Sequence, residues 1–319
     1  MRRRMISLFM IFFFFLPAIS QAEGVVTSFY PIYLFVLNLC EGIDEIEVHN
    51  LAAPDFGCLH DYQLTVSDMK ALSRADVFCI NGAGMEEYLT HVYDALPALR
   101  IVDASDGIEE VILLDGDGDL VEHDHEEHKE DQEEHHDHAH EHHHDVNPHI
   151  WMDISNAIIM VQNLSEGLSI AMPAYRDSIE SNRDHYITRL EALDTLLKEE
   201  LSDLSKKDIV TFHEAFPYFA YAYNLNIVAV MAVEPGDSLN AKEMIDLVRT
   251  EKALGNPPLF TEPQCDSPIA RTVSEETGAP LFQLDPCVTG PSNPTLTYYE
   301  DVMMKNLQVL KTALGGDLP

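Results

Sequence analysis

The chain has 319 residues, of which 46% are hydrophobic and 23% are charged, a balance that is typical of folded proteins and too apolar for a mostly disordered one. Its 55 aspartates and glutamates against 19 lysines and arginines give a formal net charge of −36, which argues against binding to a phosphate backbone as the main function. We therefore expect no nucleic-acid partner, and cations are the natural small partners. The length favours two domains, although a single α/β barrel is also compatible with it.

The N-terminus has the features of a secretory signal peptide. Arginines at positions 2–4 precede an apolar run over residues 5–16, and small residues follow at Ser20 and Ala22. We expect cleavage after Ala22, so that residues 1–22 are the signal peptide. The apolar run is too short to cross a hydrocarbon layer about 30 Å thick, and we expect no membrane insertion of the mature chain. No cysteine stands at the predicted cleavage site, which argues against a lipid anchor there.

Short β-branched runs alternate with helical patterns between residues 25 and 102. Thr65 followed by Asp68 resembles a capping box and predicts a helix start at this point. A turn of asparagine and glycines at 81–84 predicts a helix that begins near Met85. The expected strands are 25–29, 46–51, 77–80 and 100–102, with a first helix over 32–39. Strands separated by helices imply βαβ units and a parallel sheet.

A second series of the same kind follows in the C-terminal half. Its expected strands are 209–212, 227–230, 259–261 and 281–284. Between the two series, Pro173 is suited to a helix N-terminus, and residues 175–204 carry apolar positions at helical spacing without glycine or proline. A helix of about 30 residues spans about 45 Å, and we interpret it as a spine between the halves, with a helical bundle as the alternative.

These elements predict an α/β fold with two lobes, each with a parallel sheet flanked by helices, joined by one long backbone helix. The expected N-terminal lobe covers residues 23–152 and includes a disordered insert at 115–145. A connecting helical region covers 153–205, with the spine helix from about 173, and the C-terminal lobe covers 206–319.

The insert is rich in histidine and acidic residues. Residues 122–145 contain ten histidines and eleven acidic residues, and such a tract cannot build a core. Its histidines are expected to bind divalent ions weakly: His123, His125, His128, His135, His136, His138, His140, His142, His143 and His144. The alternatives are a solvated acidic linker, a calcium loop at 115–119 that lacks the required glycine, and a match to H-E-x-x-H at 140–144 that lacks an apolar helix.

Three histidines stand out by their positions among the predicted elements. His60 follows a predicted strand, His213 ends another, and His149 lies beside the only tryptophan. Ligands of open α/β sheets bind beyond the carboxyl ends of the strands, where His60 and His213 are expected, one from each half. Asp285 also ends a predicted strand, and it either joins these histidines or caps the loop before Pro286.

Three imidazoles and a carboxylate suit a transition-metal ion such as Zn²⁺, although spacing alone does not show that they converge. For His49, His91 and His185 we expect ordinary structural or solvated positions.

Five cysteines, an odd number, leave at least one thiol unpaired in a compartment where disulfides persist. Cys40 with Cys58 and Cys265 with Cys287 are near enough in sequence to close local loops, but sequence does not settle the connectivity. Cys79 lies in an apolar strand-like run, and we expect it to be a buried free thiol.

Several motifs, in their order along the chain, resemble those of the zinc-type metal-binding proteins of ABC importers. They are Gly57-Cys58-Leu59-His60-Asp61-Tyr62, the acidic histidine-rich insert, Asn147-Pro148-His149-Ile150-Trp151-Met152-Asp153, Phe212-His213-Glu214-Ala215-Phe216-Pro217-Tyr218 and Leu284-Asp285. Together with the secretion signal, they extend the resemblance over nearly the whole mature chain.

The resemblance implies one metal ion buried between two α/β lobes and handed to an ABC-type permease of the inner membrane. His60, His149 and His213 would be ligands, and Asp285 a fourth ligand or a nearby carboxylate partner. It implies Zn²⁺ as the transported ligand, no catalytic residue, and a periplasmic protein that we expect to be monomeric. Many relatives have a proline where Cys58 stands, so this thiol lies near the metal or pairs with Cys40.

Three other functions remain as alternatives. Manganese-type relatives often carry a carboxylate at the third ligand position, and the imidazole of His213 there favours zinc over Mn²⁺. A secreted zinc hydrolase would need a general base, for which Glu214 is the candidate. A metal-storage or adhesion protein would show many comparable weak sites instead of one tight site.

Overall fold

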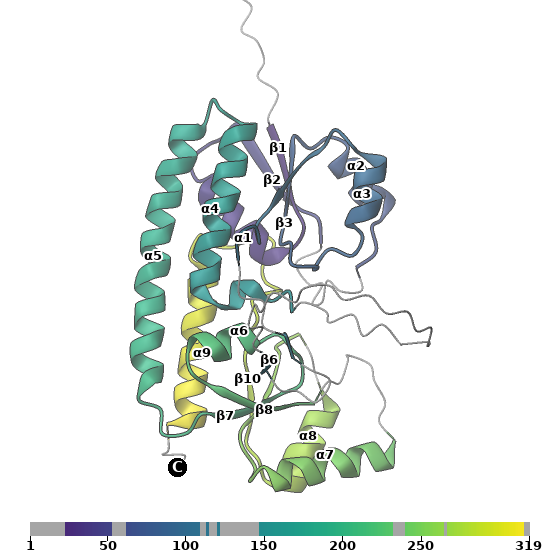
Figure 1. Ribbon diagram of the computed structural model, residues 1–319, viewed down its shortest axis with the longest axis vertical. Coiled ribbons are helices and arrows are strands. Elements are labelled where there is room, and N and C mark those ends of the chain that lie inside the picture. Colours follow the sequence, from purple (N-terminus) through teal and green to yellow (C-terminus); the bar gives the residue numbers. More distant parts are fainter. Residues whose placement is uncertain are drawn as a thin grey trace, which may run out of the picture.

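The structure is a computed structural model that describes residues 23–52, 62–108, 113–114, 120–121, 147–231, 240–264 and 267–315. Two parallel four-stranded sheets lie one above the other in Figure 1, and the long helix α5 (Arg176–Ser202) runs alongside both. The predicted fold class, α/β with two helix-flanked parallel sheets and one long backbone helix, is confirmed.

The N-terminal sheet is built from the β-branched runs expected to form it. Its strand order is β2-β1-β3-β4, and every pair is parallel. The strands are β1 (Glu23–Thr27), β2 (Ile46–Asn50), β3 (Val77–Ile80) and β4 (Arg100–Asp103), and the helices between them are α1 (Tyr30–Leu39), α2 (Val66–Leu72) and α3 (Leu89–Ala95). The expected capping box begins α2, because Thr65 Oγ1 accepts the Asp68 N–H and the Asp68 carboxylate accepts the Thr65 N–H.

The C-terminal sheet has the order β10-β9-β7-β8, again with parallel pairs. Its strands are β7 (Asp208–Thr211), β8 (Asn226–Val230), β9 (Leu259–Thr261) and β10 (Leu281–Gln283). Its helices are α6 (Pro217–Ala222), α7 (Ala241–Ala253), α8 (Pro268–Thr277) and α9 (Tyr298–Leu314). The strand β9 therefore lies between β10 and β7, although β9 and β7 are far apart in sequence.

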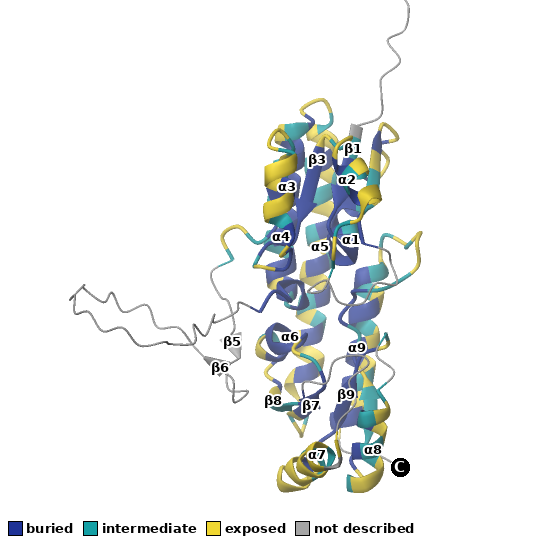
Figure 2. Cartoon of the chain, turned by 90° about the vertical axis from the view of Figure 1, so that its right-hand side faces the viewer, coloured by how far each residue is buried: buried dark blue, intermediate teal, exposed yellow. Residues whose placement is uncertain are grey.

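The spine helix belongs to a helical layer rather than standing alone. A short 3₁₀ helix, η1 (Ile150–Met152), leads into α4 (Ile154–Ala171), which packs along α5, and α5 also contacts α1 and α9. The helix α5 is therefore both a spine that runs alongside the two sheets and a member of a helical bundle. Tyr175 precedes the first turn of α5, so Pro173 lies outside the helix instead of starting it. Figure 2 shows the resulting core, with β1 and β3 buried and the outer helices α3 and α7 mostly exposed.

The helix expected near Met85 begins instead at Leu89. Gly82, Ala83 and Gly84 all have positive φ angles, between 50° and 79°. The carboxylate of Glu86 folds back over this turn and accepts the N–H groups of Asn81 and Gly82, at 2.8 and 3.1 Å. A left-handed backbone whose N–H groups are bound by a side chain does not continue into an α-helix, so α3 starts later.

A short antiparallel pair joins β5 (Leu113–Leu114) to β6 (Leu120–Val121). Leu120 and Val121 are the part of the expected insert 115–145 that the structure describes, and their backbone groups pair with a neighbouring strand. The remainder of that range, including the calcium-loop alternative at 115–119, lies outside the described residues.

Cys40, Cys79 and Cys287 are buried free thiols. The structure confirms this expectation for Cys79, whereas the suggested pairings of Cys40 with Cys58 and of Cys265 with Cys287 are wrong. Cys40 and Cys287 lie in the hydrophobic core, and burial raises the pKa of the Cys40 thiol to about 12. Apolar packing, not cross-linking, therefore fixes both residues.

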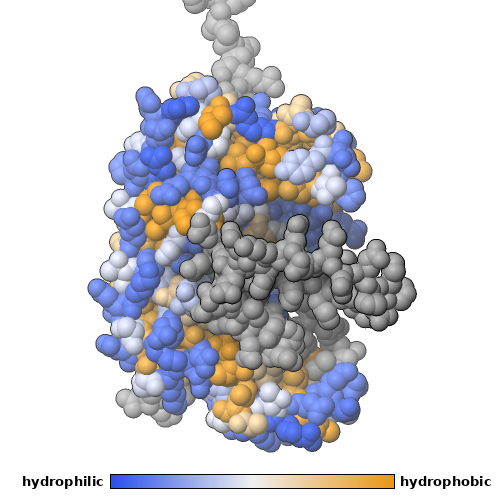
Figure 3. Space-filling model, in the orientation of Figure 1, coloured by the Kyte–Doolittle hydropathy of each residue, from blue (hydrophilic) through white to orange (hydrophobic). Residues whose placement is uncertain are grey.

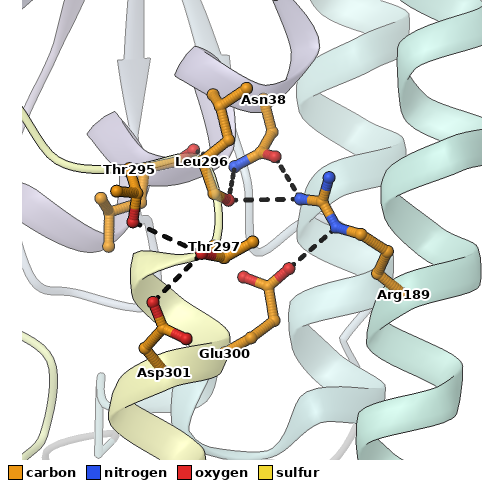
Figure 4. A network of polar contacts seen from close by, with 8 residues as sticks. Asn38, Arg189, Thr295, Leu296, Thr297, Glu300 and Asp301 are labelled. Atoms are coloured by element: carbon orange, nitrogen blue, oxygen red, sulfur yellow. Dashed lines mark hydrogen bonds and ion pairs between the residues drawn. The ribbon is translucent and has the colours of Figure 1, made fainter.

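A polar network connects α1, α5 and the segment before α9 (Figure 4). Arg189 of α5 donates to Glu300 Oε1 at 2.9 Å, to the carbonyl of Leu296 at 3.2 Å and to Oδ1 of Asn38. Asn38 in turn donates to the same Leu296 carbonyl at 3.0 Å. The guanidinium also lies 4.8 Å from the ring centre of Tyr186. One side chain thus connects three elements that are distant in sequence.

Glu251, in contrast, is a buried carboxyl group without a partner. Its side chain is fully buried on the apolar side of α7, and neither oxygen has a hydrogen-bond partner among the described residues. Burial raises its pKa from 4.5 to about 7. The folded state therefore binds this proton more tightly than the unfolded state, and stability falls as the pH rises from 4.5 through 7.

Glu251→Met is expected to remove the loss of folding stability that the parent protein shows as the pH rises. The penalty above pH 7 is on the order of 3 kcal/mol, from about 1.4 kcal/mol per pKa unit. We expect urea unfolding to show the variant more stable than the parent at pH 8 and closer to it at pH 4.5. Asp246→Asn, on the exposed side of the same helix, serves as the control. An equal difference at both pH values would contradict the prediction.

Hydrophilic residues predominate along the outer side of α5 and over α7 in Figure 3. Within the described part of the chain, no helix combines the length and the apolar character that crossing a bilayer requires.

Candidate functional site

Polar side chains gather where the strands of both sheets end. His213 follows β7, Glu262 follows β9, Asp285 follows β10 and Asn81 follows β3. The carboxyl ends of parallel strands meet at one edge of a sheet, which is where α/β proteins bind their ligands.

His149 is held in one orientation by Asn147. The ring is buried, with 4% exposed, and its Nδ1 lies 3.0 Å from Oδ1 of Asn147, which also accepts the His149 backbone N–H at 3.0 Å. An amide oxygen only accepts, so Nδ1 carries a proton and donates it to Asn147. The Asn147 amide donates to the backbone carbonyl of Glu214 at 2.8 Å, which connects this segment to the His213 region.

The N-terminal sheet supports the same segment from the other side. The Asn81 amide donates to the carbonyl of Pro148 at 3.0 Å. The turn that carries Asn81 is held by the carboxylate of Glu86, whose pKa burial raises to about 7 although the two backbone N–H groups lower it. Trp151 adds an apolar anchor, since its ring centre lies 5.1 Å from that of His149 and its N–H donates to Pro286 O at 2.8 Å.

His213 is held by a carboxylate. Its Nδ1 lies 2.6 Å from Oε1 of Glu262, whose side chain is almost completely buried. The His213 side chain is 26% exposed. Both imidazoles therefore have a protein partner at Nδ1.

The rings of His149 and His213 lie 5.0 Å apart between centroids, at an interplanar angle of 84°. A metal–nitrogen bond to imidazole is about 2.0 Å and the ring centre lies about 1.2 Å further, so two imidazoles on a tetrahedral ion have centroids about 5 Å apart. The structure thus brings together two of the predicted ligands at a ring separation compatible with a shared metal ion.

Asp285, two residues beyond β10, caps a turn. Its Oδ1 accepts the Cys287 N–H at 2.8 Å, which is the capping role weighed from the sequence. Asn306 holds the Asp285 backbone on both sides: Asn306 Oδ1 accepts the Asp285 N–H at 2.9 Å, and the Asn306 side-chain amide donates to the Asp285 carbonyl at 2.8 Å. Burial raises the pKa of Asp285, and the negative charge of Glu262 adds to this rise.

Among the described residues, no three histidine, cysteine, aspartate or glutamate side chains are close enough together to hold a metal ion. His60 and the ten histidines of the insert lie outside those residues, as does Cys58. His49, His91 and His185 are exposed, in keeping with the structural or solvated positions expected of them.

The sequence interpretation missed Glu262 and the orienting role of Asn147. Glu262 stands directly after the predicted strand 259–261, so the strand-end rule applied to His213 would also have selected it. Asn147 offered no signal beyond its position two residues before His149.

Comparison with known proteins identifies relatives along nearly the whole chain. The model of the family described as "Zinc-uptake complex component A periplasmic" matches residues 25–313. The "Zinc-binding protein AdcA" of Streptococcus pyogenes is 31% identical over 295 residues, which cover 91% of this chain and 56% of that protein. The "High-affinity zinc uptake system protein ZnuA" of Bacillus subtilis is 30% identical over 295 residues, which cover 91% of this chain and 87% of that protein.

Solved structures agree with these sequence matches. The Zn(II)-bound AdcA of Streptococcus pneumoniae superposes with a TM-score of 0.74 at 26% identity, covering 93% of this chain and 59% of that one. The Zn(II)-bound ZnuA-like domain of the same protein superposes with a TM-score of 0.73 at 25% identity. The match covers 92% of this chain and 99% of that domain. The chain thus spans somewhat more than half the length of the streptococcal AdcA proteins and nearly all of their ZnuA-like domain.

Proposed function

Because this chain belongs to the zinc-uptake complex component A family, we propose that it captures Zn²⁺ outside the cytoplasm and delivers it to an ABC-type membrane permease. The observation that carries the proposal is the pair of imidazoles, His149 and His213, 5.0 Å apart with their Nδ1 atoms bound by the protein. Two neutral nitrogen donors in a largely buried site suit zinc.

The proposed ligand set adds His60 and Asp285 to these two histidines. In this proposal His60, which follows β2 in the sequence, supplies a third imidazole, and Asp285 supplies a carboxylate beyond β10. The position of Asp285 at the carboxyl end of β10, in the same sheet as β7, supports its inclusion in the set. A nitrogen-rich set favours zinc over the manganese alternative, because Mn²⁺ prefers oxygen ligands.

We propose that the protein acts in the periplasm as a monomer, without a lipid anchor and without catalysis. The two lobes, 23–152 and 206–319, would hold the ion between them, joined by the helical region 153–205. Against the hydrolase alternative, the Glu214 side chain is exposed and its backbone carbonyl is bound by Asn147. Turnover of an ester or peptide by the zinc-loaded protein would revive that alternative.

The central test is elemental analysis of protein purified without affinity metals, together with competition titration against a zinc chelator. We expect one tightly bound zinc ion per chain and weaker binding of Mn²⁺. Tighter binding of Mn²⁺ than of Zn²⁺ would select the manganese alternative. An isotherm with many similar weak steps would select metal storage.

Deletion of residues 122–145 is expected to leave the one tight site intact. The tract supplies clustered imidazoles that bind ions weakly, whereas the tight site uses residues outside it. A calorimetric zinc titration of the deletion variant should therefore show the one tight binding step without the weak ones. Disappearance of the strong step would place the tight site in the tract.

A further inference from the structure

Glu262 lies directly behind one of the proposed ligands. The strands β7 and β9 are neighbours in parallel register, with Thr211 opposite Phe260. His213 and Glu262 each follow two residues later, so the register itself places the imidazole beside the carboxylate. The contact of 2.6 Å between His213 Nδ1 and Glu262 Oε1 results from this alignment.

Both oxygens of Glu262 are occupied within the protein. Oε1 accepts from His213, and Oε2 accepts from the side-chain amide of Gln264. Only 5% of Glu262 is exposed. A carboxylate held in this way is a hydrogen-bond acceptor for the histidine and is not placed as an oxygen ligand for a metal.

We propose that Glu262, held by Gln264, is a positioning residue that fixes His213 with its proton on Nδ1 and directs the lone pair of Nε2 at the ion. A neutral histidine carries its single proton on either nitrogen, and an acceptor beside Nδ1 selects the tautomer that leaves Nε2 available. The inference rests on the proposed zinc function for its biological meaning, but the tautomer itself is a property of the metal-free protein.

The two imidazoles of the site are therefore supported differently. The neutral amide of Asn147 supports His149, whereas the carboxylate of Glu262 supports His213 and makes it the stronger donor. Glu262 thus adds negative charge behind the site while leaving the donor atom a nitrogen. This arrangement favours a divalent ion that prefers nitrogen ligands.

Two substitutions separate orientation from charge. Glu262→Gln keeps an acceptor oxygen for Nδ1 but removes the charge, and Glu262→Met removes both while preserving the length of the side chain. The zinc affinity is expected to fall about tenfold in the first and about a hundredfold in the second, the range observed when a partner of a metal-bound histidine is lost. Glu276→Gln, on the exposed surface of α8, is the charge-matched control and should bind as the parent does.

The decisive measurement is the ¹⁵N spectrum of the histidine rings in zinc-free protein at pH 8, with His213→Ala used to assign the His213 signals. We expect His213 to be protonated at Nδ1 in the parent and in Glu262→Gln, and to shift towards Nε2 protonation in Glu262→Met. An unchanged tautomer and affinity in Glu262→Met would overturn the proposal. A loss of zinc affinity in Glu262→Gln as large as the loss in His213→Ala would also overturn the proposal, because Glu262 would then act as a ligand.

If Glu262→Met does not fold, Glu262→Gln decides alone, and an unchanged zinc affinity in that variant overturns the proposal. The tautomer is read without zinc, so this test is separate from that of the proposed function. A parent protein that binds no zinc tightly would contradict the function, while the ring spectrum would still decide the role of Glu262.

Discussion

His149→Ala and His213→Ala are each expected to weaken zinc binding about a hundredfold to a thousandfold. A four-ligand zinc site contributes about 10–16 kcal/mol of binding free energy, so an equal share per ligand is about 2.5–4 kcal/mol. Since about 1.4 kcal/mol corresponds to a factor of ten, loss of one imidazole gives the stated range. Competition titration against a chromogenic chelator measures the change.

Exposed histidines provide the matched controls for this experiment. His91→Ala and His185→Ala remove an imidazole from the surfaces of α3 and α5 and are expected to leave the affinity unchanged. Thermal unfolding of the zinc-free variants checks that the fold is retained, because His213→Ala also removes the partner of buried Glu262. Parent-like affinity in either site variant would show that the 5.0 Å ring pair is not the metal site.

Arg189→Met is expected to destabilise the protein by about 2–3 kcal/mol, since removing one partner of a buried ion pair costs about 3–5 kcal/mol and this arginine is partly exposed. The substitution leaves Glu300, with 13% of its side chain exposed, without its cation and Asn38 Oδ1 without its donor. Burial already raises the pKa of Glu300, and Arg189 lowers it. Loss of Arg189 raises this pKa further, so the destabilisation should be smaller at pH 5 than at pH 8.

Urea unfolding at the two pH values measures this effect. The double variant Arg189→Met with Glu300→Gln should recover part of the lost stability at pH 8, because no buried charge remains unpaired. Arg249→Met, which breaks an exposed pair with Asp246 on α7, is the control and is expected to cost about 0–1 kcal/mol. A loss at pH 8 equal to that of Arg249→Met would show that the network in Figure 4 contributes little.

Local sequence patterns predicted most of the elements because each pattern is carried by neighbouring residues. The β-branched run 77–80 forms β3 with the bounds expected, and the capping box at Thr65 begins α2. The helix expected at Met85 was wrong because Glu86 reaches back to Asn81, an interaction that hydrophobic periodicity does not contain. The suggested disulfides failed for a similar reason, since loop length says nothing about whether the core encloses a thiol.

For the site, the sequence by itself determined the candidate ligands and their positions at strand ends. Only the tertiary structure decided that the rings of His149 and His213 lie 5.0 Å apart and that Glu262 contacts His213 Nδ1. The reason is that strand order and register arise from pairing between segments far apart in the chain: β9 enters between β10 and β7, and that placement aligns two residues 49 positions apart. Composition and spacing specify which chemistry is available, and long-range packing specifies which side chains meet.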